Sequence, residues 1–445
     1  MKFTKIALAA VTLVAAQAHA DTVYLAGASA TSSNYRSALT ALCGSAGGTA
    51  TTLSSGSNLF AVKCSTDFAG LPGVDAVSFN VSGGSFTAVT TSAGTDTADF
   101  INPAASAPGA IVFTGARSSE GGFLDIDGAA FSADDLLAAG LSESPTTTPA
   151  SFSQVFGVAV SNDLYTALQA AQGLASCGVD SITPECQPNI TRAQYTSIVT
   201  STFNTAKLDV NATLGVGSAG DLLTVCRRVS TSGTQASSNQ FFLNGFVGTG
   251  ANGGALAPAT AADYGIANSG LPSFDVQEGS GTGNARACLS NSGFALGVLS
   301  LENAPDLTTR SGGARADRQW RFVKVNGVHA YEPAVNSTAT AKNGSYEFWF
   351  TSHKYGHTAN GQAVVDAIDT ELSSGLDRAV LQSGGEPAQR KSAPDIGQPV
   401  GVERIGHHNQ DRHIEIDKEQ RREELGSGVS ADVMHGLPPC WPAAR

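Results

Sequence analysis

Short apolar runs alternate with amphipathic stretches along much of the chain. In TVYLAGASATSSNYRSALTALC, a β-rich run at residues 23–25 and a turn of small residues precede Tyr35, Leu39 and Leu42, which share one helical face. Strand followed by helix recurs at residues 154–171 and 294–303. This alternation favours an α/β fold with largely parallel sheets, and 445 residues suffice for two packed units.

Other parts of the chain break this pattern. Residues 86–122 and 250–285 are rich in small residues and have no sustained period, which indicates loops or insertions. The stretch AVVDAIDTEL, residues 363–372, is the last amphipathic helix that the pattern predicts. From about residue 385 the charge density rises and apolar periodicity disappears. We expect residues 385–445 to be a disordered or foreign tail.

The composition narrows the possible partners and the compartment. Only 14% of the residues are charged and the formal net charge is -12, which disfavours nucleic acid as a partner. The opening MKFTKIALAAVTLVAAQAHA has two lysines, an apolar run and a small-x-small end, as a signal peptide does. We expect residues 1–20 to be removed, leaving a soluble periplasmic or secreted protein that begins at Asp21.

The cysteines fit an oxidising compartment. Six of the seven lie in the main body, where an even number indicates disulfides before metal ligands or catalytic thiols. Proximity in sequence favours the first two pairs and leaves the third, although other connectivities stay open. The candidates, in that order of pairing, are Cys43 with Cys64, Cys177 with Cys186, and Cys226 with Cys288.

The stretch RRVSTSGT has the parts of an anion site. Ser232, Gly233 and Thr234 offer two hydroxyls and a close backbone approach, and a helix predicted from Gln235 offers N–H groups and a dipole. Arg228 adds a planar fork that can grip two oxygens. Alone, the same stretch is also compatible with a capped helix beside a solvated arginine.

Two more turns carry donors of the same kind. GASATSSN, residues 27–34, contains Thr31 and Ser32, and NVSGGSF, residues 80–86, contains Ser82 and Gly83. Both place hydroxyls and glycine where a helix can start. Three such turns from distant parts of one chain are what a ligand cleft between two lobes would use.

In this order the motifs resemble a known family. LAGASATSSNY, NVSGGSFTAV, DGAAFSADDLL, VFGVAVSN, CRRVSTSGTQASSNQFFLNG, GFALGVLSLE and YEFWFTSHK follow one another as in the phosphate-binding proteins of ABC importers, which are type II periplasmic binding proteins. The resemblance spans residues 21 to about 380. It implies a two-lobed α/β fold that closes over a tetrahedral oxyanion, acts as a monomer without cofactor or catalysis, and delivers the ligand to a membrane ABC permease. The implied parts are lobe 1 from 21–156 and 349–384, and lobe 2 from 157–348.

The resemblance also implies a ligand set and shows two departures from it. The matching positions are Thr31, Ser32, Ser82, Arg228, Ser232, Gly233 and Thr234. Ser230 stands where the family has an aspartate, and Asp127 is the candidate for a second family carboxylate. A carboxylate in the pocket would accept the proton of hydrogen phosphate and repel sulfate, which has none. Phosphate is therefore the expected ligand, with sulfate or another oxyanion left open.

Two other function classes stay open from the residues. A secreted phosphatase could use the same pocket, and a surface or adhesion protein could keep the fold without the ligand. His353 and His357, in HKYGH, have a spacing that suits a metal on a helix, but the preceding EFWF reads as strand and surface histidines are favoured. No Gly-x-Ser-x-Gly nucleophile motif occurs.

Overall fold

A computed structural model describes residues 21–181, 183–200, 214–218, 221–243, 273–303, 319–330 and 338–374. The expected signal peptide and the expected C-terminal tail lie outside these residues, as does most of the predicted 250–285 loop. Among the described helices, none is long and apolar enough to cross a membrane.

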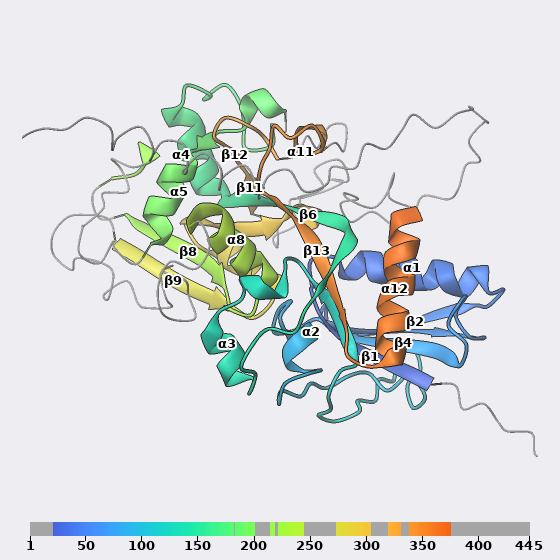
Figure 1. The fold of residues 1–445 in the computed structure, drawn as a ribbon. Helices are drawn as coiled ribbons and strands as arrows, with labels where there is room; N and C mark the ends of the chain where they lie inside the picture. The colour runs from blue at the N-terminus through green and yellow to red at the C-terminus, as the bar shows by residue number, and fades with distance from the viewer. Residues whose placement is uncertain are drawn as a thin grey trace, which may run out of the picture. The chain divides into compact units, whose positions relative to one another are not determined.

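Most of the described strands belong to one mixed sheet. It contains 11 strands in the order β2-β3-β4-β1-β5-β13-β6-β10-β8-β9, with β11 paired to β6 (Figure 1). The strands are β1 (Asp21–Gly27), β2 (Ala50–Ser55), β3 (Leu59–Cys64), β4 (Val74–Asn80), β5 (Gly121–Leu124), β6 (Thr148–Ser161), β8 (Leu222–Arg228), β9 (Ser273–Gly279), β10 (Phe294–Ser300), β11 (Trp320–Phe322) and β13 (Trp349–Gly356). A separate pair joins β7 (Asn189–Ile190) to β12 (Lys324–Val325).

The helices fill the connections that the sequence pattern predicts. They are α1 (Ser32–Ser45), α2 (Thr87–Thr90), α3 (Ala133–Ala138), α4 (Asn162–Ala171), α5 (Arg192–Val199), α8 (Gly233–Leu243), α10 (Thr282–Asn291), α11 (Ala339–Lys342) and α12 (Ala359–Ser374). Short 3-10 turns are η1 (Gly128–Ala130), η2 (Pro184–Cys186) and η3 (Leu301–Asn303). Strand and helix alternate as expected, so the chain is an α/β protein.

The sheet is mixed rather than largely parallel as predicted: each half has a parallel group of strands, the first half adds the antiparallel pairs β2-β3 and β3-β4, and the halves join through antiparallel pairs. β1 runs parallel to β4 and β5, and β8 runs parallel to β9 and β10. Between these groups, β6 pairs antiparallel with β13 through its first part and with β10 through its second part. The long strand β6 and its partner β13 therefore connect the two halves.

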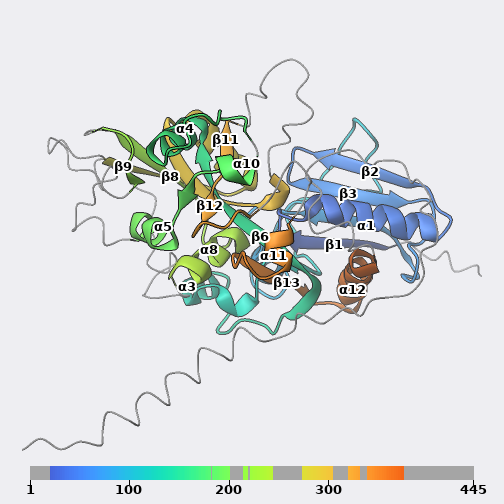
Figure 2. The same cartoon turned by 90° about the horizontal axis from the view of Figure 1, so that it is seen from above.

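The first half has its own hydrophobic core, here called the first core. Tyr35 of α1 stacks between Phe79 and Phe123, with ring centroids 5.3 and 4.6 Å away. α12 closes this core beside α1 (Figure 2). Its predicted apolar face is buried as expected. The members of the first core include Val23, Leu25, Tyr35, Leu39, Phe60, Val62, Val77, Phe79, Phe123, Phe152, Val364, Val365, Ile368 and Leu372.

The second half is built around another cluster, here called the second core. Its members come from one stretch of sequence between β6 and β13, and they include Phe156, Val158, Leu164, Tyr165, Ile198, Leu223, Val225, Leu289, Leu296, Trp320 and Phe348. The first core, by contrast, needs residues from the N-terminal part and from α12. A smaller cluster joins Ala236 of α8 to Phe86, Leu124 and Phe131.

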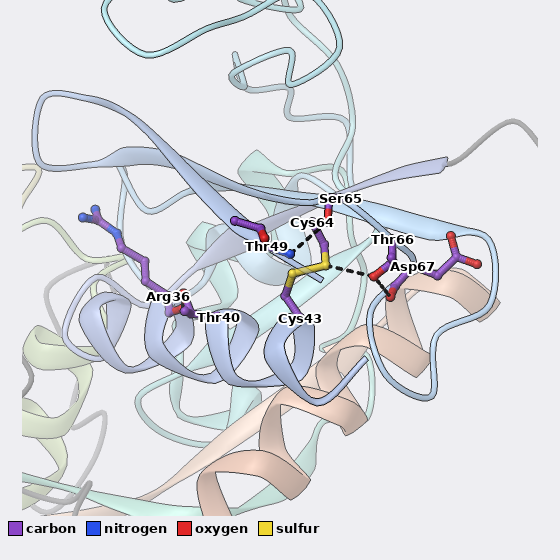
Figure 3. The surroundings of a disulfide bond; sticks show 8 residues. All are labelled: Arg36, Thr40, Cys43, Thr49, Cys64, Ser65, Thr66 and Asp67. Atoms are coloured by element: carbon purple, nitrogen blue, oxygen red, sulfur yellow. Dashed lines mark hydrogen bonds between the residues drawn. A yellow bond between two sulfur atoms is a disulfide. The ribbon is translucent and has the colours of Figure 1, made fainter. Parts of the chain in front are cut away.

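The pairing of all six body cysteines matches the prediction. Disulfides connect Cys43 to Cys64, Cys177 to Cys186, and Cys226 to Cys288. Figure 3 shows the first, which ties the end of α1 to the end of β3. Beside it the Ser65 hydroxyl accepts a hydrogen bond from the Thr49 backbone N–H at 2.9 Å. The third disulfide ties β8 to α10, close to the predicted anion turn.

Candidate functional site

The carboxyl ends of the parallel strands in the two halves face each other. On the first side Leu124, the last residue of β5, lies opposite His353, which in turn lies opposite Pro149 of β6. On the second side Ser300, the last residue of β10, lies opposite Phe156 of the same strand β6. Since ligands of open α/β sheets bind outside the carboxyl ends of strands, the residues that follow β5, β8, β9 and β10 converge on a candidate site.

Arg228 ends β8 and is buried, with 2% of its surface exposed. Its Nε–H donates to the Gly279 carbonyl at 3.2 Å, and its Nη groups donate to Ser280 O at 2.9 Å and Thr282 Oγ1 at 3.0 Å. A guanidinium has more N–H groups than these three contacts use. Burial lowers the pKa of Arg228 to about 10 while Asp125 raises it, so the side chain stays charged at neutral pH.

The N-terminus of α8 lies against the first half of the molecule. α8 packs next to the η1 turn that leads into α3 (Figures 1 and 2). Gly233, its first residue, lies so close that an added Cβ would come within 2.3 Å of Ser85 Oγ and 2.7 Å of Asp125. Ser232, Gly233 and Thr234 are all buried. The helix start thus presents N–H groups and a positive dipole end in a water-poor place.

Asp125 is the acidic member of the site, and the sequence analysis did not select it. Only 3% of the residue is exposed. Its Oδ2 accepts a hydrogen bond from Ser85 Oγ at 2.9 Å, whereas its buried Oδ1 has no hydrogen-bond partner among the described residues. Burial raises the pKa of Asp125 to about 6, against the smaller lowering effects of Ser85 and Arg228. At neutral pH the site therefore contains a carboxylate oxygen that is ready to accept a proton.

The structure places the predicted Asp127 elsewhere. Its side chain is exposed and accepts hydrogen bonds from the Ala129 backbone N–H at 3.1 Å and from Thr147 Oγ1 at 3.0 Å, so it caps the η1 turn. An aspartate before glycine at a helix start is a capping pattern, whereas Asp125 directly follows a buried strand. That position at a strand end was the signal that could have identified Asp125.

The first predicted turn lies close to the second half through a chain of hydroxyls. Ser29 Oγ is 3.1 Å from Thr282 Oγ1, which itself accepts from Arg228. Thr31 is buried and donates a hydrogen bond to the hydroxyl of Tyr35, and Asp125 contributes to raising the pKa of that tyrosine after the larger effect of burial. Ser32 begins α1 and is half-buried.

The second predicted turn contributes Ser85 more directly than Ser82. The hydroxyl of Ser82 donates to Asn80 Oδ1, whose oxygen also accepts from the Ser82 backbone N–H at 2.9 Å. Ser85, three residues on, is the residue that contacts Asp125. Gly84, with φ of +95°, allows the close approach here, because an added Cβ would lie 2.6 Å from Ser232 Cα.

Direct hydrogen bonds hold the anion turn against the first half. Ser230 Oγ donates to Asp135 Oδ1 of α3 at 2.7 Å, and Thr231 Oγ1 donates to Gly83 O at 2.5 Å. The Phe86 backbone N–H donates to Thr231 O at 2.9 Å. Ser230, where the resembled family has an aspartate, thus pairs with a carboxylate supplied from the opposite side. These contacts join the anion turn directly to the first half of the sheet.

The histidines of HKYGH lie on strand β13 and the turn after it. His353 is buried, with Nδ1 2.9 Å from Thr147 Oγ1, which differs from the surface position we expected. His357 Nδ1 is 3.3 Å from the Tyr355 hydroxyl. No cluster of three or more metal-ligating His, Cys, Asp or Glu side chains occurs in the described part of the chain.

Comparisons with known proteins give likenesses at the level of the fold. No family model and no curated protein sequence matches the chain. Among solved structures, it is similar to a protein described as a phosphate ABC transporter substrate-binding protein, from Clostridium perfringens, with phosphate bound; the TM-score is 0.43 at 14% identity, over 82% of this chain and 100% of that one. A phosphate-binding protein from Stenotrophomonas maltophilia gives 0.36 at 14% identity, over 79% and 83%. At such values no residue role is transferred.

Proposed function

We propose that this protein is an exported solute-binding protein that captures phosphate, or a closely related protonated oxyanion, as a monomer and delivers it to a membrane ABC permease. The observation that carries the ligand assignment is Asp125. Its carboxylate lies beside Gly233 at the start of α8 through Oδ2, and Arg228 acts on it electrostatically. The other oxygen, Oδ1, is buried and has no hydrogen-bond partner among the described residues. The delivery role rests on the order of motifs along the chain.

The arrangement suits a ligand that is both an acceptor and a donor. Arg228, the N–H groups at the start of α8 and the hydroxyl of Ser32 offer hydrogen bonds to anionic oxygens. The Thr31 hydroxyl donates to Tyr35 in the described conformation and is not among these donors. Asp125 offers the opposite, an acceptor for a ligand proton. Monohydrogen phosphate and arsenate have such a proton, whereas sulfate would place an unprotonated oxygen against a buried carboxylate.

Capture and release require the two halves to separate. Arg228 and the start of α8 are buried, and the contacts of Ser230 and Thr231 hold the turn against the first half. We take the first and second cores as two lobes, and β6 and β13 as the strands through which they bend. In this proposal the described conformation is the closed one.

Thermal unfolding of the chain, stripped of bound anion, tests the proposal. With phosphate at about 1,000 times its dissociation constant the free energy of unfolding should rise by roughly 4 kcal/mol, with a matching effect of arsenate. Sulfate and chloride at equal ionic strength are the controls and should give no comparable rise. An equal rise with sulfate would contradict the role of Asp125, and no rise with any oxyanion would contradict the function.

A further inference from the structure

A second acidic residue, Glu302, lies in the middle of the connection between the two cores. It belongs to η3, directly after β10 and two residues beyond Ser300. Gln154 lies in the part of β6 that pairs with β13, two residues before the part that pairs with β10 begins at Phe156. Its Nε2–H donates to Glu302 Oε2 at 2.9 Å. Glu302 therefore lies at the carboxyl end of β10, the strand next to β8, which ends at Arg228. We refer to this position at the strand ends as the floor of the site.

The carboxylate of Glu302 is held in one orientation. Its Oε1 accepts from Ser300 Oγ and from Asn303 Nδ2, the latter at 3.0 Å. Gln154 itself is 4% exposed and also donates to the Val155 carbonyl at 3.2 Å. A glutamate that only completed a turn would not need a third donor from β6 in addition to Ser300 of β10 and Asn303 of η3.

The charged and titratable groups around Glu302 connect it with the anion site. Asp125 acts on it electrostatically from the end of β5. Glu302 and Asp125 both act on Tyr35 of α1. On the remaining side, Arg286 of α10 reaches Asn303 Oδ1 at 3.5 Å and does not bond Glu302 directly in the described residues. The pKa of Glu302 is raised to about 8 because burial outweighs the lowering effect of Ser300, with Asp125 adding to the rise.

We propose that Glu302 is a specificity-determining residue of the site, which must carry a proton when a dianion is bound. The inference rests on the proposed function. The charges of Arg228 and Asp125 sum to zero. The remaining electrostatic stabilisation of a dianion such as monohydrogen phosphate therefore comes from the dipoles of α8 and α1. A second ionised carboxylate on the floor would repel it, whereas a protonated Glu302 is neutral and offers an O–H donor.

Binding of the dianion is then linked to uptake of a proton by Glu302. The effect is small near pH 7, where Glu302 is already protonated, and grows as it becomes ionised in the free protein. Inorganic phosphate itself is almost wholly the monohydrogen dianion in mildly alkaline solution and supplies no proton change. Affinity should also decline with rising pH, because the proton must be recovered from water.

Titration calorimetry of inorganic phosphate with the full chain at about pH 8.5, in buffers of different ionisation enthalpy, measures the proton uptake. We expect about half a proton or more per bound anion in the native protein, and close to none for Glu302→Gln, which keeps the shape of the side chain and stays neutral. Glu143→Gln, at an exposed glutamate, is the matched control and should behave as the native protein. Equal uptake in Glu302→Gln and the native protein would overturn the proposal.

Two further readings separate this inference from the function itself. If the native protein shows no phosphate binding at all, the proposed function fails; if it binds without proton uptake, only the role of Glu302 fails. Should Glu302→Gln not fold, as judged by thermal unfolding, Gln154→Met serves instead. The hydrogen bond from Gln154 lowers the pKa of Glu302. Its removal should therefore raise that pKa and move the onset of proton uptake to higher pH. An unchanged onset would overturn the proposal.

Discussion

The two sides of the candidate site differ in the chemistry that they present. The second-core side has Arg228 and the start of α8, both of which favour negative charge. The first-core side has Asp125 and Ser85, and its free carboxylate oxygen disfavours any oxygen that lacks a proton. One side therefore supplies affinity for anions in general, and the other restricts which anion is accepted.

This difference separates affinity from selectivity by residue. Loss of a group on the cationic side should weaken every oxyanion alike, whereas loss of the acidic group should change their order. The arrangement costs folding free energy, because the charges of both Arg228 and Asp125 are removed from water.

The largest expected effect is on the cationic side. Arg228→Met should reduce phosphate affinity by on the order of 2–3 kcal/mol, because a charge-assisted contact in an enclosed site is lost. Titration calorimetry against native protein measures it, with Arg117→Met, at an exposed arginine, as the control. Retained affinity in Arg228→Met would contradict the assigned site.

Asp125→Asn should reverse the selectivity. Sulfate should gain affinity relative to phosphate by roughly tenfold or more, because the amide can donate where the carboxylate repels. Competition between the two anions in calorimetry gives the ratio. An unchanged ratio would place the discrimination on another residue.

The same residue should control the pH dependence of stability without ligand. The folded state raises the pKa of Asp125 to about 6, so it binds a proton more tightly than the unfolded chain does. The contribution of Asp125 to stability is then fully present below its ordinary pKa and is lost as the pH rises through about 6. Asp125→Asn should consequently be more stable than the native protein at pH 7, by on the order of 2 kcal/mol, and the difference should vanish near pH 4. Denaturant unfolding at both pH values checks this; a native protein more stable at pH 7 would refute it.

Closure of the two sides should depend on the room at Gly233. Gly233→Ala adds a Cβ that would collide with Ser85 and Asp125. We expect a loss of about 1–2 kcal/mol of phosphate affinity, as for other overpacked contacts. Gly283→Ala, where an added Cβ has open space, is the matched control for calorimetry. Equal affinities of the two variants would argue against a closed site.

The smallest expected effect is on the contact that holds the turn closed. Ser230→Ala removes the hydrogen bond to Asp135 and should cost about 0.5–1.5 kcal/mol of the closed state, which corresponds to a phosphate release rate several-fold faster. Stopped-flow displacement measures that rate. Ser373→Ala, on an exposed position of α12, should leave it unchanged.

Strong periodicity made most of the fold predictable, while the acidic residues of the site were not. The α12 face and the disulfide pairs followed from apolar spacing and proximity. The choice between Asp125 and Asp127 could not be made from the sequence, because the end of the strand and the start of the turn lie two residues apart. Only the path of the backbone decides which of the two side chains faces inward. Glu302 was missed for a similar reason. Its side chain is held by Gln154, which is distant in sequence and becomes its neighbour only when β6 pairs with β10.

The split origin of the first core has a consequence for the order in which the two cores fold. Strands β1 to β5 come early in the sequence, but their apolar face is completed only by Val364, Val365 and Ile368 of α12. The second core comes from one continuous stretch and can form without that helix. We expect the docking of α12 to be the last step, so a chain truncated before residue 359 would retain a folded second core and a protease-sensitive first one.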